Sequence, residues 1–184
     1  MRILFTFVTL LILTNCQPEL ENKADAVLFF DVKQLVANQV KLLAGKKLQV
    51  QKFIRHDKQR ENNIINISNW GQELKIFEEA NLNRPIYKDA YLQKDSVVQD
   101  IKYLIFTAKT DRLQVKSLRL AYKEGVLKSL DANLTIENIL YHSEKKLHLS
   151  FAPNKQLVGY GVKGNFSVIY GAKYDYEIDA VISE

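Results

Sequence analysis

Apolar and polar residues alternate in the stretch LDANLTI at residues 130–136, and this pattern decides the fold. Successive side chains of a β-strand point to opposite faces, so the alternation predicts a strand with one apolar and one polar face. A change of phase at Lys116–Ser117 predicts a β-bulge. The same period of two recurs in the segments 101–105, 113–122, 147–151, 160–170 and 174–182. The second half of the chain is therefore expected to be a series of β-strands.

Short turn signals separate these strands. They fall at Thr110-Asp111, Glu124-Gly125, residues 143–146, Pro153-Asn154 and residues 171–173. Parallel strands need a crossover connection of a dozen or more residues, and the connections here are shorter. Neighbouring strands are therefore expected to pair antiparallel, as a meander of about six to eight strands with one face toward water.

A helix and a hairpin are predicted before the meander. Apolar residues three and four apart predict a helix over residues 31–44, with Asp25 or Asp31 as its N-cap. Residues 48–54 alternate and predict a strand. The polar residues 55–63 predict the long tip of a hairpin that leads to a partner strand.

A second helix is predicted after this hairpin. Trp70, Leu74 and Phe77 are spaced so that they share one face of a helix, which is expected to run to about residue 80. The sequence thus predicts an α+β fold with two N-terminal helices packed on one face of a curved antiparallel sheet, an open or half barrel. Residues 25–184 are expected to form this single domain.

The first residues predict an export signal. Met1 and Arg2 precede an unbroken run of Ile, Leu, Phe, Val and Thr over residues 3–13, as in the charged and hydrophobic regions of a signal peptide. Eleven helical residues extend about 16 Å, and a hydrocarbon core is about 30 Å thick, so the run is too short for a membrane span. Residues 1–15 are therefore predicted to be a cleaved signal peptide.

The run ends in Leu13-Thr14-Asn15-Cys16, which contains the only cysteine of the chain. This segment resembles the lipobox of bacterial lipoproteins, and the resemblance implies that Cys16 is acylated and becomes the first residue of the mature chain. The alternative is an ordinary thiol in a leader that is discarded. Residues 16–24 are predicted to be the lipidated cysteine and a polar tether. Two or three acyl chains suffice for stable membrane attachment.

Composition excludes several function classes. Loss of the leader removes Arg2 and lowers the net charge from +5 to +4, which is too small a surplus for a nucleic-acid binder. With Cys16 acylated, the chain has no thiol for a disulfide, a metal or catalysis. His56, His142 and His148 are interpreted as solvated turn residues. No catalytic sequence motif is present, and the adjacent carboxylates Glu78 and Glu79 are expected to point in different directions on a helix surface, so no catalytic residue, metal or cofactor is predicted.

Aromatic residues crowd the last two predicted strands. Alternating tyrosines on a sheet form stabilising cross-strand pairs, and this is the simpler interpretation. The alternative is a concave apolar lining that accepts a lipid or another apolar ligand. The candidate ligand-binding residues are Trp70, Tyr160, Tyr170, Tyr174 and Tyr176.

Two resemblances follow from these segments. The lipobox, Phe30-Asp31, Asn69-Trp70 and the stretch NLNRP at residues 81–85, together with the tyrosine-rich meander, resemble uncharacterised lipoproteins of the Bacteroidetes group. The order of elements is similar to the outer-membrane lipoprotein receptor of the Lol pathway, which implies an unclosed antiparallel barrel whose helices plug its concave side and which binds acyl chains.

The leading functional hypothesis is a non-catalytic binding or assembly module, held by its lipid at the cell envelope, in the outer membrane. Its partners are the membrane and an apolar ligand or an envelope protein. The second hypothesis is a carrier or sensor that holds a lipid or another apolar molecule between helices and sheet. The third is a hydrolase of envelope polymers, for which the sequence offers neither a nucleophile nor a metal set.

Overall fold

The computed structural model describes residues 29–171 and 173–183. The predicted signal peptide, residues 1–15, and the predicted lipidated Cys16 with its tether, residues 16–24, lie outside the described residues. In chain order the described elements are α1 (Val32–Leu43), β1 (Gln49–His56), β2 (Gln59–Ile65), α2 (Trp70–Leu74), the 3₁₀ helices η1 (Lys75–Ala80) and η2 (Pro85–Tyr87), β3 (Tyr91–Val98), β4 (Ile101–Ala108), β5 (Val115–Lys123), β6 (Val126–Glu137), β7 (Tyr141–Phe151), β8 (Leu157–Val168) and β9 (Lys173–Ser183).

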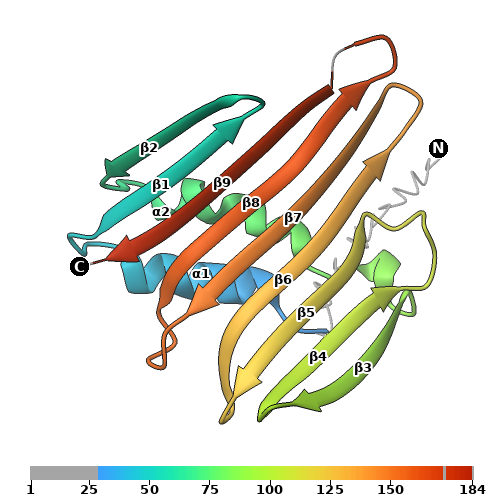
Figure 1. The fold of residues 1–184 in the computed structure, drawn as a ribbon. Helices are drawn as coiled ribbons and strands as arrows, with labels where there is room; N and C mark the ends of the chain where they lie inside the picture. The colour runs from blue at the N-terminus through green and yellow to red at the C-terminus, as the bar shows by residue number, and fades with distance from the viewer. Residues whose placement is uncertain (1–28, 172, 184) are drawn as a thin grey trace, which may run out of the picture.

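All the described strands belong to one antiparallel sheet, in the order β2-β1-β9-β8-β7-β6-β5-β4-β3 (Figure 1). Strands β3 to β9 form the expected meander. The β1–β2 hairpin extends this meander because β1 pairs with β9, the last strand of the chain. The sheet is not closed, since β2 and β3 form its two edges. The α+β class and the open antiparallel sheet are confirmed. The expected six to eight strands become nine because the hairpin joins the sheet.

Helix α1 agrees with the prediction, and its N-cap is now assigned. The Asp31 carboxylate accepts a hydrogen bond of 2.9 Å from the backbone N–H of Gln34, and Gly45 follows the helix with a φ of +76°. The prediction of two N-terminal helices is wrong for the second one, because the hairpin that precedes α2 joins the sheet as β1 and β2. Both helices nonetheless lie on the same face of the sheet (Figure 1).

The second predicted helix changes type after one turn. Helix α2 is capped by the side chain of Asn69 and continues as the 3₁₀ helix η1. A 3₁₀ helix has three residues per turn, so side chains three apart lie in line. Leu74, Phe77 and Ala80 have this spacing, and each is at most 1% exposed. The tighter winding therefore points all three side chains at the sheet.

The predicted hairpin tip over residues 55–63 is wrong. Strand β1 extends to His56 and β2 begins at Gln59, so only Asp57 and Lys58 form the turn. Strand β2 is the edge of the sheet, and its side chains are exposed except for the half-buried Ile65. An edge strand with charged residues on both sides lacks the alternation of apolar and polar residues. For this reason the sequence pattern did not predict a strand here.

The Lys116–Ser117 bulge is confirmed by a shift of register between β5 and β6. The turn predicted at residues 143–146 is wrong, because these residues lie inside β7. The turn comes earlier, where the side-chain oxygen of Asn138 accepts hydrogen bonds from the backbone N–H groups of Leu140 and Tyr141. His142 and His148, expected to flank the turn, both lie in β7.

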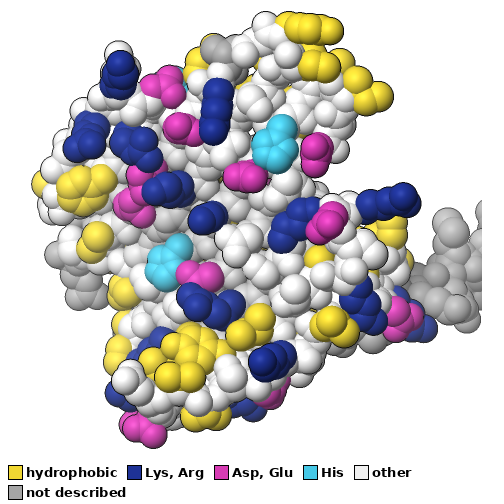
Figure 2. Space-filling view, turned by 45° about the vertical axis from the view of Figure 1, so that its right-hand side comes forward, with side chains coloured by type: hydrophobic (Ala, Val, Ile, Leu, Met, Phe, Trp, Pro, Cys, Tyr) yellow, Lys and Arg dark blue, Asp and Glu magenta, His cyan; other side chains and the backbone are white. Residues whose placement is uncertain are grey.

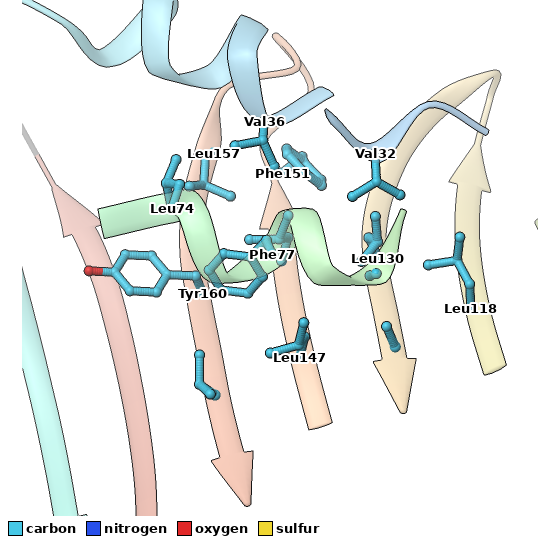
Figure 3. Packing of buried hydrophobic residues seen from close by; sticks show 14 of the residues in the cluster. Val32, Val36, Leu74, Phe77, Leu118, Leu130, Leu147, Phe151, Leu157 and Tyr160 are labelled. Atoms are coloured by element: carbon cyan, nitrogen blue, oxygen red, sulfur yellow. The ribbon is translucent and has the colours of Figure 1, made fainter. Parts of the chain in front are cut away.

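The core lies between the helices and the sheet, as Figure 3 shows. Phe77 of η1 is fully buried, and its ring meets that of Tyr160 edge to face at 6.0 Å. One polar side chain joins the layers: Gln39 of α1 donates to the backbone oxygen of Lys155 at 3.0 Å and accepts from the N–H of Leu157 at 2.8 Å. Side chains of both layers thus fill the space around Phe77. Among the described residues, no helix has the length and apolar character to span a membrane.

Candidate binding site on the open face of the sheet

The sheet has a covered face, which carries the helices, and an open face on the other side. One row of paired residues crosses the open face from β5 to β9. Arg119 pairs with Asp131, Asp131 with His148, His148 with Gly161, and Gly161 with Asp179. Their neighbours in sequence are buried against the helices, so strand alternation directs this row outward. Residues distant in the chain therefore form one continuous polar strip.

Asp131 is the centre of this strip. Its Oδ1 lies 2.7 Å from Nδ1 of His148, and its Oδ2 accepts a hydrogen bond of 3.1 Å from Nη2 of Arg119. The guanidinium of Arg119 also lies 5.7 Å from the ring centre of Tyr103. These contacts fix the carboxylate between the side chains of His148 and Arg119, and the three residues form one preorganised group on β5, β6 and β7.

The same contacts shift two pKa values in opposite directions. Burial on its own raises the pKa of Asp131, but the hydrogen bonds from His148 and Arg119 outweigh burial and lower it. The hydrogen bond to Asp131 raises the pKa of His148 against the opposing effect of burial, and the nearby Asp179 charge raises it further. The imidazolium and the carboxylate therefore stabilise each other's charged forms.

A second ionic group lies one row away. Glu177 of β9 accepts hydrogen bonds from Nε and Nη2 of Arg55 at 3.0 and 2.7 Å, and its other oxygen lies 3.2 Å from Nζ of Lys163. The hydrogen bonds from Arg55 are the main reason that the pKa of Glu177 is lowered. Both hydrogen bonds from Arg55 end on Oε2 of Glu177 and Lys163 lies at Oε1, so both oxygens of the carboxylate have a cationic partner.

A hollow of about 500 Å³ lies between the two ionic groups. Gly161 forms part of its lining, and a Cβ at this position would come within 2.8 Å of Oδ1 of Asp179. Figure 2 shows histidine, acidic and basic side chains gathered on this face. The hollow has the depth of a small-ligand site.

Two charges in the hollow remain available to a ligand. Asp179 and Lys146 both line it, and neither forms an ion pair or a side-chain hydrogen bond within residues 29–171 and 173–183. A carboxylate accepts hydrogen bonds from hydroxyl and amino groups, and an ammonium group donates to carboxylates and carbonyls. The hollow therefore matches a polar ligand that carries donors and acceptors, or charges of both signs.

Ser117 and Ser150, near the hollow, lack the partner of an activated nucleophile in the described structure. Serine hydroxyls around the hollow have other partners: Ser117 accepts from Asn133 at 2.8 Å, and Ser150 donates to the backbone oxygen of Gly159 at 3.2 Å. A serine nucleophile needs a hydrogen bond to the histidine that activates it. Over the part of the chain that the structure describes, no group of His, Cys, Asp and Glu has the geometry of a metal site.

The candidate aromatic residues do not form one site. Trp70 is buried in the core, whereas the Tyr170 ring is 97% exposed. Tyr174 stacks on His56, with ring centres 6.0 Å apart, beside the β1–β2 turn. Only Tyr160 and Tyr176 come together, in a second hollow between η1 and the sheet. Cys16, the predicted lipid attachment, lies outside the described residues.

The second hollow, the Tyr160 groove, has a volume of about 520 Å³ and a largely apolar lining. Its apolar members include Ile67, Ile76, Tyr160, Val162, Tyr176 and Ile178. Glu73 closes one side: it accepts a hydrogen bond of 2.7 Å from the Tyr160 hydroxyl and lies 2.6 Å from Nζ of Lys52. Burial, with the Glu73 carboxylate, raises the pKa of Tyr160 well above its usual range.

The open-face strip was missed from the sequence. Alternation did place Asp131, His148 and Asp179 on the polar side of their strands. It could not show that they are neighbours, because the register of four strands brings them together. Comparisons with protein-family models, curated proteins and solved structures give no match to this chain. Function is therefore inferred from the geometry.

Proposed function

We propose that the protein is anchored to the cell envelope, in the outer membrane, by acyl chains on Cys16. There it serves as a non-catalytic binding module whose binding surface is the hollow on the open face. One observation carries the assignment of the face: Asp179 and Lys146 line a preorganised polar hollow, and neither forms a salt bridge or a side-chain hydrogen bond in the described chain. On the covered face, by contrast, the Tyr160 groove has a largely apolar lining, which includes Phe77.

The ligand class follows from the charges in the hollow. The carboxylate of Asp179 and the ammonium group of Lys146 both lie at the hollow, next to His148. A partner with hydroxyl, amino and carboxyl groups matches both signs of charge. Envelope polymers built from sugars and short peptides have this chemistry, so we propose them as the ligand class.

Reversal of one charge tests the binding face. Non-acylated Cys16→Ala protein is incubated with purified peptidoglycan sacculi, which contain sugar hydroxyls, amines and carboxylates, and the sedimented fraction is measured. Lys146→Glu is expected to weaken retention about tenfold, because it replaces a donor by a like charge beside Asp179. Lys33→Glu is the matched control: it makes the same charge change on exposed α1 and should leave retention unchanged.

Equal retention of the two variants would contradict the assignment of the face. The anchor is tested separately by labelling with radioactive palmitate. The label should appear in the natural chain and vanish in Cys16→Ala. An unlabelled mature protein that stays in the soluble fraction would exclude the anchor without bearing on the binding face.

The Tyr160 groove supports a second candidate function, as a carrier or sensor of an apolar molecule. Its apolar lining and its volume of about 520 Å³ suit part of an acyl chain. Native mass spectrometry of protein purified from its own membrane distinguishes the two functions. A stoichiometric non-covalent lipid that is lost on Ile178→Asp would favour the carrier, and a protein that carries only its covalent acyl chains would favour the binding module.

A further inference from the structure

Large apolar side chains occupy the tips of two neighbouring hairpins. Ile139 and Leu140 in the β6–β7 turn are 86% and 69% exposed, and Ile169 and Tyr170 in the β8–β9 turn are 60% and 97% exposed. The N–H of Ile169 donates to the backbone oxygen of Leu140 at 3.0 Å, so the two turns touch. Figure 1 places both tips at one end of the sheet, and Figure 2 shows hydrophobic side chains at that end.

The fold itself does not require apolar residues at these tips. Turn positions favour Gly, Asn, Asp, Ser and Pro, and a single Asn138 side chain already satisfies the N–H groups of Leu140 and Tyr141. In the other turn, the N–H of Gly171 donates to the backbone oxygen of Val168 at 3.0 Å. These backbone N–H groups are thus hydrogen-bonded within their own turns, while the apolar side chains point outward. A contiguous exposed apolar patch of this kind marks an interaction surface.

The shape of the patch favours a bilayer over a protein partner. Together the four exposed side chains offer about 400 Å² of apolar surface, whereas a standard protein interface buries about 800 Å² on each partner. Tyrosine beside aliphatic residues suits the boundary between headgroups and acyl chains, where one end of the ring is apolar and the other is wet.

An acylated Cys16 would keep the domain, and with it the hairpin tips, close to a membrane. Twelve residues separate Cys16 from Phe29, and a fully extended chain of this length spans at most about 40 Å. We propose that Ile139, Leu140, Ile169 and Tyr170 insert into the interface of the membrane that holds the lipid anchor. This inference rests on the proposed acylation for its proximity argument. Insertion would orient the sheet relative to the bilayer and hold the open face at a defined angle to it.

The test uses the full mature protein in vesicles of phosphatidylethanolamine and phosphatidylglycerol, with brominated lipids as quenchers. Tyr170→Trp places a fluorescent indole at the tip, and the natural Trp70 is buried and serves as background. Val97→Trp is the matched control, since Val97 is 70% exposed in the hairpin at the opposite end of the sheet. The indole at position 170 should shift to the blue and lose more than half of its emission, and the indole at position 97 should change little.

The possible outcomes distinguish membrane insertion of the hairpin tips from membrane attachment by the lipid anchor. Protein that stays bound to vesicles without quenching at position 170 would overturn insertion and leave the anchor intact. Equal quenching at both positions, or a blue shift that grows with protein concentration without vesicles, would also overturn it. Should the chain prove to carry no lipid, the non-acylated protein is titrated with vesicles. Leu140→Asp with Ile169→Asp must then weaken binding at least tenfold relative to Val97→Asp with Val98→Asp, and equal binding overturns the proposal.

Discussion

The same strands form both faces of the sheet, but the two faces carry different kinds of side chains. Leu147 and Leu149 point from β7 into the core and are at most 2% exposed, while His148 between them points into a polar hollow. On the covered face, stability comes from the burial of apolar surface and close packing. On the open face, charges are paired at the surface, where each pair contributes little to stability. The covered face therefore determines the fold, and we propose that the open face serves binding.

The largest expected effect separates the two faces with one residue type. Phe77→Ala on the covered face should destabilise the protein by about 4 kcal/mol, since a buried phenyl ring is removed and a cavity remains. Phe53→Ala on the open face, where the ring is 43% exposed, should cost less than about 1 kcal/mol. Urea unfolding of both variants measures the difference. Similar costs would show that the covered face is not the sole core.

The second prediction concerns the polar link within the covered face. Gln39→Ala should destabilise by about 2 kcal/mol, because the N–H of Leu157 and the backbone oxygen of Lys155 both lose their partner. Gln34→Ala on the exposed side of the same helix is the control and should cost a few tenths of a kcal/mol, about the value of an exposed pair. Thermal unfolding compares the variants. Equal melting temperatures would mean that water satisfies the two backbone groups.

The smallest effect tests the ionic group of the open face. The raised pKa of His148 gives stabilisation that is present below pH 6.5 and is lost as pH rises through the folded pKa. The lowered pKa of Asp131 gives stabilisation that is present above pH 3.8 and is lost as pH falls through the folded pKa. The pair is therefore most stabilising near pH 5, by about 0.5 kcal/mol after allowance for its exposure.

His148→Gln should then reduce the free energy of unfolding more at pH 5 than at pH 9. In the Asp131→Asn background the same substitution should show no such difference, because the partner charge is absent. Chemical unfolding at the two pH values provides the measurement. If His148→Gln lowered the free energy of unfolding equally at pH 5 and pH 9, ionic coupling between His148 and Asp131 would be excluded. Only a contact that does not depend on charge would then remain.

The two faces also differ in how much the sequence revealed. The covered face follows from local periods: LDANLTI, the phase slip at residues 116–117 and the helix over residues 31–44 each predict their element because apolar residues recur toward the core. The strand β2 escaped this reasoning because an edge strand exposes both faces. The turn misplaced at residues 143–146 shows the same weakness, since polar residues continue along β7 toward its exposed end.

The open-face site was beyond sequence reasoning for a physical reason. Arg119, Asp131, His148 and Asp179 come from four strands, and their meeting depends on a register set by the bulge in β5 and by packing on the covered face. A shift of one residue would turn each of them toward the helices. The candidate aromatic residues do not share a site for the same reason. Alternation along a strand predicts the face on which a side chain lies, but it does not predict which residues of other strands lie beside it.

Hydroxyl-radical footprinting of the protein in its own isolated membrane, compared with the purified protein, tests the central claim most directly. The account predicts that oxidation of Phe53, Tyr103 and His148 on the open face falls when the envelope is present, while oxidation of Tyr176 in the Tyr160 groove stays the same. Unchanged oxidation at the three open-face residues, together with protection of Tyr176, would contradict the claim that the open face is where this protein binds.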